Sequence, residues 1–284
     1  MTKIKGRDME TSINATRLNA ISTLISGLSI LLFRNKLTHL FEISDNTPFW
    51  VVGGVITVFS LTMFVEVKKQ RALALLWIIA QDLMFTLASI IVLIFRPFDI
   101  SDKGYLLIGL FIIPIVFFII YQTIGLARMD AKKGTNIKLM SFSRSIKADK
   151  SKVWETISDV GNYHEVAPNI DGSEIISGEK VGMVRACSHG KDSWTETCSL
   201  WEDEKEYSFE VDTTQADYPY PLKVLRGNWQ VHEVTKDETR ISMNFEFEYK
   251  RSFQNILIHP VMKHQFNKVC KELLDNWQNK LEGE

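Results

Sequence analysis

Four polar side chains in the second half of the chain have the types that acid–base chemistry needs. Arg185 and Glu196 fall on two successive expected strands, and His164 and Arg226 complete the set. If they meet in the interior, a carboxylate or an imidazole can act as general base while an arginine stabilises an enolate-like charge. Arg185 and Glu196 can instead form a cross-strand ion pair on the solvent face, which we favour. Arg185, Glu196 and His164 are the candidate catalytic residues, and whether the chain is an enzyme stays open.

The histidines and cysteines give no sign of a metal or cofactor site. The three cysteines, Cys187, Cys198 and Cys270, are widely spaced and odd in number, which suits a reducing compartment rather than a zinc site or a disulfide scaffold. His259 and His264 are five residues apart, which places them on different faces of a helix. The chain lacks the G-x-S-x-G, Walker A and dinucleotide-binding motifs. We therefore expect no metal ion and no cofactor.

Two further polar residues, Gln81 and Asp82, lie near the middle of a long apolar run. An ionisable group at that depth in a membrane costs at least a few kcal/mol unless it faces a partner or water. Asp82 can serve as a proton or substrate relay, or it can be hydrogen-bonded to a Ser, Thr or Asn side chain of a neighbouring helix and stabilise the bundle. We favour the second interpretation, because no other buried ionisable residue accompanies it.

The first half of the 284-residue chain carries four apolar runs that approach or reach the roughly 20 residues of a spanning helix. They cover residues 18–33, 49–67, 72–95 and 105–126. Short connections between them predict an up-and-down antiparallel four-helix bundle over residues 1–134. A polar stretch precedes the first run, so we expect no cleavable signal peptide. The net charge of −1 gives no indication of nucleic-acid binding.

Positive charges on the connections predict the orientation of the bundle. Cations are concentrated before the first run, between the second and third, and after the fourth; they are Lys3, Lys5, Arg7, Arg17, Lys68, Lys69, Arg71, Arg128, Lys132 and Lys133. The other two connections hold Arg34, Lys36, Arg96 and Lys103. We therefore expect an integral protein of the plasma (inner) membrane, with both termini and the second half of the chain in the cytoplasm.

The second half, residues 135–284, reads as an α+β domain. Expected strands cover residues 137–146, 173–177, 183–188, 193–201, 206–213, 222–234 and 239–250, and Asp149 looks like the N-cap of a helix after the first strand. In the last strand apolar and polar residues alternate, so one face is buried. A long amphipathic helix begins between residues 252 and 260 and runs to the end. Its apolar face is expected to cover the apolar face of the antiparallel sheet.

Three stretches of this half carry a resemblance to a known family. Residues 142–154, FSRSIKADKSKVW, look like a first strand leading into a helix; residues 158–163, SDVGNY, look like the turn that follows; and residues 178–185, GEKVGMVR, match a G-x-x-x-G-x-x-R hairpin. The region from about Lys138 onward resembles the polyketide cyclase/dehydrase and lipid-transport proteins of the START-like (SRPBCC) superfamily. The resemblance implies a helix-grip fold, an antiparallel sheet wrapped around a long C-terminal helix. His164 and Val166 depart from the family pattern, in which a tryptophan often follows the tyrosine.

The resemblance also implies a cavity between the sheet and the final helix that accepts an apolar ligand. The residues expected to line it are Tyr207, Phe209, Trp229, Met243, Phe245, Phe247 and Phe266. For each of them alone, core filling is the more ordinary explanation of an alternating apolar pattern. The loop at residues 217–222, DYPYPL, can be a lid, a surface that touches lipid headgroups, or a stiff connection, and we weigh these evenly.

These observations predict a membrane-anchored cytoplasmic domain that binds or transfers a hydrophobic small molecule or lipid. A cyclase or dehydratase acting on a hydrophobic substrate, and a tethered scaffold without a ligand, are the alternatives. About ten residues connect the fourth run to the first strand, at most roughly 35 Å when extended, which is expected to keep the domain near the membrane. The ligand and the oligomeric state cannot be named from the sequence.

Overall fold

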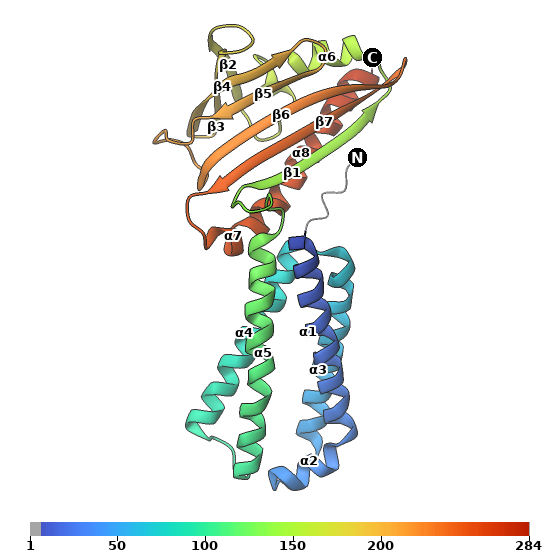
Figure 1. Ribbon diagram of the computed structural model, residues 1–284, viewed down its shortest axis with the longest axis vertical. Coiled ribbons are helices and arrows are strands. Elements are labelled where there is room, and N and C mark those ends of the chain that lie inside the picture. The colour runs from blue at the N-terminus through green and yellow to red at the C-terminus, as the bar shows by residue number, and fades with distance from the viewer. Residues whose placement is uncertain (1–6, 284) are drawn as a thin grey trace. The chain divides into compact units, whose positions relative to one another are not determined.

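The protein forms two compact units that are joined near Met129. The structure, a computed structural model, describes residues 7–283, with side chains from Ser12 onward. One unit extends to Met129 and takes in Asn255–Val261, and the other comprises Asp130–Gln254 and the chain from Met262 (Figure 1). Lys3 and Lys5, two of the cations used to orient the first helix, lie outside the described residues.

The first unit is helical, and its long helices confirm the four that were expected. Helices α1, α3, α4 and α5 are long and apolar enough to cross a membrane. The shorter α2 was not expected from the sequence. The bounds are α1 (Arg7–Leu32), α2 (Arg34–Phe41), α3 (Thr47–Lys69), α4 (Ala72–Phe95) and α5 (Asp102–Arg128).

Helix ends in this unit follow local chemistry. The Ser101 hydroxyl accepts a hydrogen bond from the Gly104 backbone N–H and so caps the start of α5. Gln70 adopts a left-handed conformation, with φ of 47°, and ends α3. Only Gln70 and Arg71 separate α3 from α4, so the chain reverses its direction sharply between the two helices.

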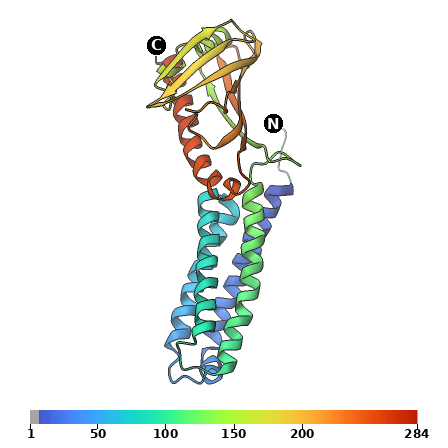
Figure 2. The same cartoon turned by 90° about the vertical axis from the view of Figure 1, so that its left-hand side faces the viewer.

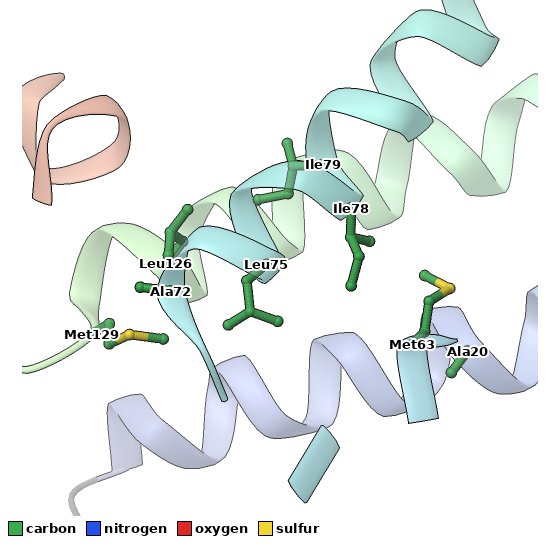
Figure 3. Close-up of a cluster of buried hydrophobic side chains, with 8 residues drawn as sticks. All are labelled: Ala20, Met63, Ala72, Leu75, Ile78, Ile79, Leu126 and Met129. Atoms are coloured by element: carbon green, nitrogen blue, oxygen red, sulfur yellow. The ribbon is translucent and has the colours of Figure 1, made fainter. Parts of the chain in front are cut away.

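Close packing joins three pairs of these helices: α1 with α3, α1 with α5, and α4 with α5. Gly27 of α1 lies so near α3 that an added Cβ would be 2.5 Å from the Thr57 hydroxyl. A cluster of apolar side chains fills the end of the bundle nearest the α3–α4 connection (Figure 3). Its buried members are Ala20, Met63, Ala72, Leu75, Ile78, Ile79, Leu126 and Met129.

The second unit contains a seven-stranded antiparallel sheet with the order β1-β7-β6-β5-β4-β3-β2. The strands are β1 (Lys138–Ile146), β2 (Gly172–Ser177), β3 (Val184–His189), β4 (Asp192–Glu202), β5 (Glu206–Val211), β6 (Leu222–Thr235) and β7 (Glu238–Tyr249). Helix α6 (Lys150–Ser158) and the short helix η1 (Tyr163–Glu165) follow β1, and α7 (Gln254–Leu257) and α8 (His259–Glu282) follow β7. Asp149 caps α6 by accepting a hydrogen bond from the Lys152 backbone N–H at 2.9 Å, as expected.

Register decides which side chains share the inner face of the sheet. Phe245 of β7 is opposite Met140 of β1 and Gly227 of β6, and Trp229 is opposite Tyr207 of β5. Helix α8 lies along this face (Figures 1 and 2), where the Phe266 ring is 4.7 Å from that of Phe245. The predicted helix-grip architecture is therefore confirmed, and any interior site lies between α8 and the inner face.

Candidate functional site

An ion pair between Arg185 of β3 and Glu196 of β4 lies on the inner face of the sheet. The two residues are register partners, and Arg185 Nη2 is 2.5 Å from Glu196 Oε2. Arg185 is 1% exposed and Glu196 is 7% exposed. The expected cross-strand pair is thus present, but its expected placement on the solvent face is wrong. Both charges point inward because Glu196 shares a strand face with the buried Trp194 and Cys198.

The remaining bonding groups of this pair are largely used by the protein. The Trp194 indole N–H donates to Glu196 Oε1 at 2.9 Å, so both carboxylate oxygens accept a hydrogen bond. Arg185 Nη1 donates to the Val160 carbonyl at 3.2 Å. Burial opposes the charge on Arg185, but the Glu196 carboxylate outweighs it and keeps the pKa of Arg185 above its ordinary value. Arg185 therefore stays protonated.

Two aromatic rings enclose the guanidinium of Arg185. Its Cζ lies 4.3 Å from the centre of the Phe209 ring and 4.8 Å from that of the Tyr163 ring. Burial raises the pKa of Tyr163 well above its usual value, so its hydroxyl remains neutral. The Tyr163 ring also contacts Trp229 and Trp277, with ring centres 6.1 Å apart in each case. Tyr163 thus connects the charged pair with the aromatic interior.

Three buried polar atoms in this interior have no hydrogen-bond partner within residues 7–283. They are Arg185 Nε, Trp229 Nε1 and the Tyr218 hydroxyl. Tyr218 lies in the loop between β5 and β6, and its ring packs against Trp194 at 6.2 Å. Each of the three can donate a hydrogen bond, so the interior is suited to a group that accepts one.

All seven residues predicted to line a pocket face the same interior. Tyr207, Phe209, Trp229, Met243, Phe245 and Phe247 are buried on the inner face, and Phe266 is half-buried on α8. Tyr207 stacks on Trp229 at 5.2 Å, and its hydroxyl donates to the Ile157 carbonyl at 2.8 Å. This part of the interior is therefore closely packed.

Some inner-face side chains are accessible to solvent although their neighbours are buried. Phe142 of β1, Val211 of β5, Leu225 of β6 and Phe266 of α8 are all half-buried. Phe142 and Phe266 are in edge-to-face contact, with ring centres 6.0 Å apart. These residues are the part of the apolar inner face that stays partly exposed to solvent.

His164 and Arg226 do not take the places that the sequence suggested. The His164 ring lies 3.1 Å from the Ser173 hydroxyl, and it is the neighbouring Tyr163 that contacts Arg185. Arg226 is exposed and binds Glu210 across β5 and β6 at 3.0 Å, so the idea that it points inward is wrong.

The loop at residues 217–222 packs onto the sheet. Tyr218 is buried, and its ring contacts both Trp194 and Tyr220. The loop is also held by Gln215, which accepts a hydrogen bond from the Thr195 backbone N–H. The sequence singled out the loop of Tyr218 but not its contact with Trp194, and it did not indicate Tyr163 or Trp194 as site residues. Of these, only Trp194, two residues before Glu196 on one strand face, could have been placed from spacing.

The described residues provide neither a reactive thiol nor a metal site. Burial raises the pKa of Cys187 to about 12, with a further contribution from Glu196, and burial raises that of Cys270 to about 12. Within residues 7–283 no group of three His, Cys, Asp or Glu side chains can hold a metal ion.

In the helical unit, Asp82 of α4 accepts a hydrogen bond at Oδ2 from Asn19 Nδ2 of α1, at 2.7 Å. The same amide nitrogen is 3.2 Å from Gln122 Oε1 of α5. These contacts agree with the interpretation that Asp82 stabilises the bundle by a hydrogen bond to a neighbouring helix. Gln81, its neighbour, is half-buried and lies instead on the surface between α3 and α4.

An antiparallel sheet around a long C-terminal helix defines the helix-grip class, and in this chain the interior is aromatic with one buried ion pair. Residues 139–282 match the model of the family described as polyketide cyclase/dehydrase and lipid transport. The chain belongs to this family, which confirms the resemblance drawn from the sequence.

Several solved structures resemble about half of the chain at low identity. The Zhui aromatase/cyclase from Streptomyces sp. R1128 is 13% identical with a TM-score of 0.41, and covers 50% of this chain and 95% of its own. A START superfamily protein from Mycobacterium smegmatis is 13% identical with a TM-score of 0.42; the match covers 51% of this chain and 97% of the Mycobacterium protein. Norcoclaurine synthase from Thalictrum flavum, in complex with dopamine and hydroxybenzaldehyde, is 16% identical with a TM-score of 0.42; the match covers 52% of this chain and 88% of the synthase. No curated protein matches the chain.

Proposed function

We propose that this chain is a membrane protein whose helix-grip domain binds or transfers a hydrophobic small molecule or lipid. Membership of the polyketide cyclase/dehydrase and lipid transport family supports the apolar ligand, and the four candidate spans support the membrane location. The observation that carries the proposal is the set of buried, unpartnered donors in an otherwise aromatic interior.

Such donors are unfavourable unless a bound molecule satisfies them. Leaving a buried donor without a partner costs about 1–3 kcal/mol, and native proteins rarely do so. Arg185 and Trp229 both contact the ring of Tyr163, so the side chains that carry these two free N–H groups belong to one cluster. An oxygen of a ligand placed there would recover the loss. The ligand is therefore an apolar molecule that carries an acceptor oxygen, such as a carbonyl or a carboxyl group.

The apolar part of the ligand would occupy the accessible side of the interior. Phe142, Val211, Leu225 and Phe266 offer hydrocarbon surface there and are only half-buried. Covering apolar surface is worth roughly 25 cal/mol per Å². The hydrophobic effect would thus provide most of the affinity, while the donors would fix the orientation.

The arrangement of Glu196 favours binding over catalysis. A general base needs a lone pair directed at its substrate, but Arg185 and Trp194 already occupy both carboxylate oxygens. The Arg185–Glu196 pair is better suited to holding the guanidinium in place, with its Nε available to a ligand.

We place the helix-grip domain in the cytoplasm. Lys68 and Lys69 end α3 and Arg71 precedes α4, while Arg128 ends α5 and is followed by Lys132 and Lys133. This concentration of cations is typical of cytoplasmic connections. Alkaline phosphatase fused after residue 134 should be inactive; strong activity there would contradict the orientation.

The binding proposal is tested on the full-length protein in detergent, with palmitic acid as the probe and native mass spectrometry as the readout. Trp229→Phe keeps an aromatic ring but removes the free N–H, so retention of the fatty acid should fall at least about fivefold. Trp201→Phe is the matched control, because its indole N–H donates to Asp203 at the surface. Equal retention by the two variants, or no retention by the wild type, would overturn the proposal.

A further inference from the structure

The four long helices leave one side of their bundle open. Helix α1 packs along α3 and α5, and α4 packs along α5, but α3 and α4 approach each other closely only near their connection. There Met63 of α3 and Leu75 and Ile78 of α4 belong to one cluster (Figure 3). Between the two helices lies a groove of about 830 Å³, which we call the α3–α4 groove.

The walls of the α3–α4 groove are apolar and exposed. They include Val55, Val58 and Val65 of α3, and Ala74 and Trp77 of α4. Val58 is 62% exposed and Trp77 is 63% exposed. The groove extends from Gly54 to Glu66 along α3, about 18 Å at the rise of an α-helix. That length suits one acyl chain, because half of a bilayer core is about 15 Å thick.

One end of the groove is charged. Glu66 and Arg71 line it and form an ion pair, in which Arg71 uses Nε and Nη2. Lys68 and Lys69 are exposed beside them, so three cations and one carboxylate leave two positive charges at this end. Lys and Arg side chains near a membrane surface attract anionic headgroups. The charge thus lies where the headgroup of a lipid in the groove would be.

We propose that the α3–α4 groove binds one anionic phospholipid, with an acyl chain against Val58 and Trp77 and its phosphate at Lys68, Lys69 and Arg71. The apolar walls are long enough for a chain, and the positive end selects the negative headgroup. This site is separate from the interior of the helix-grip domain, so Trp229→Phe should leave it unchanged.

The test uses the full-length protein in nanodiscs of phosphatidylglycerol and phosphatidylcholine in equal amounts, released into native mass spectrometry. We expect one phosphatidylglycerol per chain to be retained at least tenfold over phosphatidylcholine. Ala74→Trp fills the groove and should abolish this retention. Ala88→Trp, a matched change at an exposed position of α4 outside the groove, should preserve it.

A second variant guards against misfolding of Ala74→Trp. Gly54→Leu also fills the groove, and no atom lies within 4 Å of an added Cβ at Gly54, so the folded bundle can accommodate it. It should lose phosphatidylglycerol as well. Retention of the lipid by Gly54→Leu would overturn the proposal.

The headgroup and the competing occupant are tested in the same assay. Lys68→Gln/Lys69→Gln should abolish the preference for phosphatidylglycerol, whereas Lys36→Gln/Lys103→Gln, at exposed positions of α2 and of the first turn of α5, should not. If a second copy of the chain filled the groove, the spectra would instead show a dimer without bound lipid. Gln81→Leu, a change in the groove wall, would dissociate that dimer. That outcome, or equal retention of both lipids by the wild type, would refute the site.

Discussion

Arg185 and Glu196 face each other across β3 and β4 and form an ion pair that is almost completely removed from solvent. Their contacts extend to Trp194, Val160 and the rings of Tyr163 and Phe209. The pair therefore connects the distal strands of the sheet with the segment between α6 and η1. Its stability should depend on the presence of both charges.

Removing one partner of this pair should destabilise the protein strongly. Glu196→Gln or Arg185→Met leaves one charge buried without its counter-charge, at a cost of about 3–5 kcal/mol. The double variant Arg185→Met/Glu196→Leu should cost less than the sum of the single changes. Urea unfolding of the full-length protein in micelles, followed by tryptophan fluorescence, measures these free energies of unfolding.

The exposed pair of Glu210 and Arg226, which also joins register partners on neighbouring strands, is the matched control. Arg226→Met should change the free energy of unfolding by less than about 1 kcal/mol. If Arg185→Met and Arg226→Met lowered the free energy of unfolding by the same small amount, the buried Glu196 would not need the positive charge of Arg185.

Gly227 provides the space that the Trp229 ring occupies on the inner face. A Cβ at position 227 would lie 2.5 Å from the Trp229 indole and 3.2 Å from the Phe245 ring. Gly227→Ala should therefore destabilise the domain by about 1–3 kcal/mol through overpacking. Gly161→Ala, whose added Cβ would meet only Ile175 at an ordinary 3.5 Å, should change stability by no more than about 0.5 kcal/mol. Thermal unfolding of the two variants compares them directly, and equal shifts in Tm would refute the packing argument.

The order of elements in the helix-grip domain was predictable because its sheet has one buried face. The alternation of Ile241, Met243, Phe245, Phe247 and Tyr249 repeats with the two-residue period of a strand, and β7 (Glu238–Tyr249) contains all five. The long apolar helices were predictable for a similar reason, since lipid requires continuous runs. Periodicity thus determined the type and order of most elements.

The chemistry of the interior was harder to predict. Charged residues usually lie at the surface, and this rule placed the Arg185–Glu196 pair on the wrong face. Because Trp194, Glu196 and Cys198 alternate along β4, Glu196 shares the buried face of its two neighbours. Its burial is favourable only because Arg185, its register partner on β3, supplies the opposite charge. The contact of Tyr218 with Trp194 joins a loop to a strand more than twenty residues away, and local sequence carries no signal for it.

Lys138 should make the stability of the helix-grip domain depend on alkaline pH. Its side chain is fully buried at the start of β1, and burial lowers its pKa to about 8, with Asp130 opposing the shift and Lys263 adding to it. Between about pH 8 and 10.5 the unfolded chain binds more protons than the folded protein at this residue. The free energy of unfolding should therefore rise with pH in this window, by at most about 3 kcal/mol from this group.

The variant Lys138→Met isolates this contribution. It should be more stable than the wild type below pH 8, and the difference should shrink as the pH rises towards 10.5. Urea unfolding at a series of pH values measures it. Parallel stability curves for the two proteins would show that Lys138 carries the same charge in both states throughout.

The hydrogen bond from Asn19 to Asp82 should stabilise the helical bundle. Asn19→Leu deprives the buried Asp82 carboxylate of its donor and removes the contact with Gln122, so the bundle should lose about 1–2 kcal/mol. Asp82→Asn can still bond to Asn19 and should lose less. Thr62→Val is the control, because the exposed Thr62 hydroxyl donates only to Phe59 of its own helix. Thermal unfolding of the full-length protein in micelles gives the comparison; if Asn19→Leu melted no lower than Thr62→Val, Asp82 would not depend on this bond, and its interpretation as a structural carboxylate would lose its support.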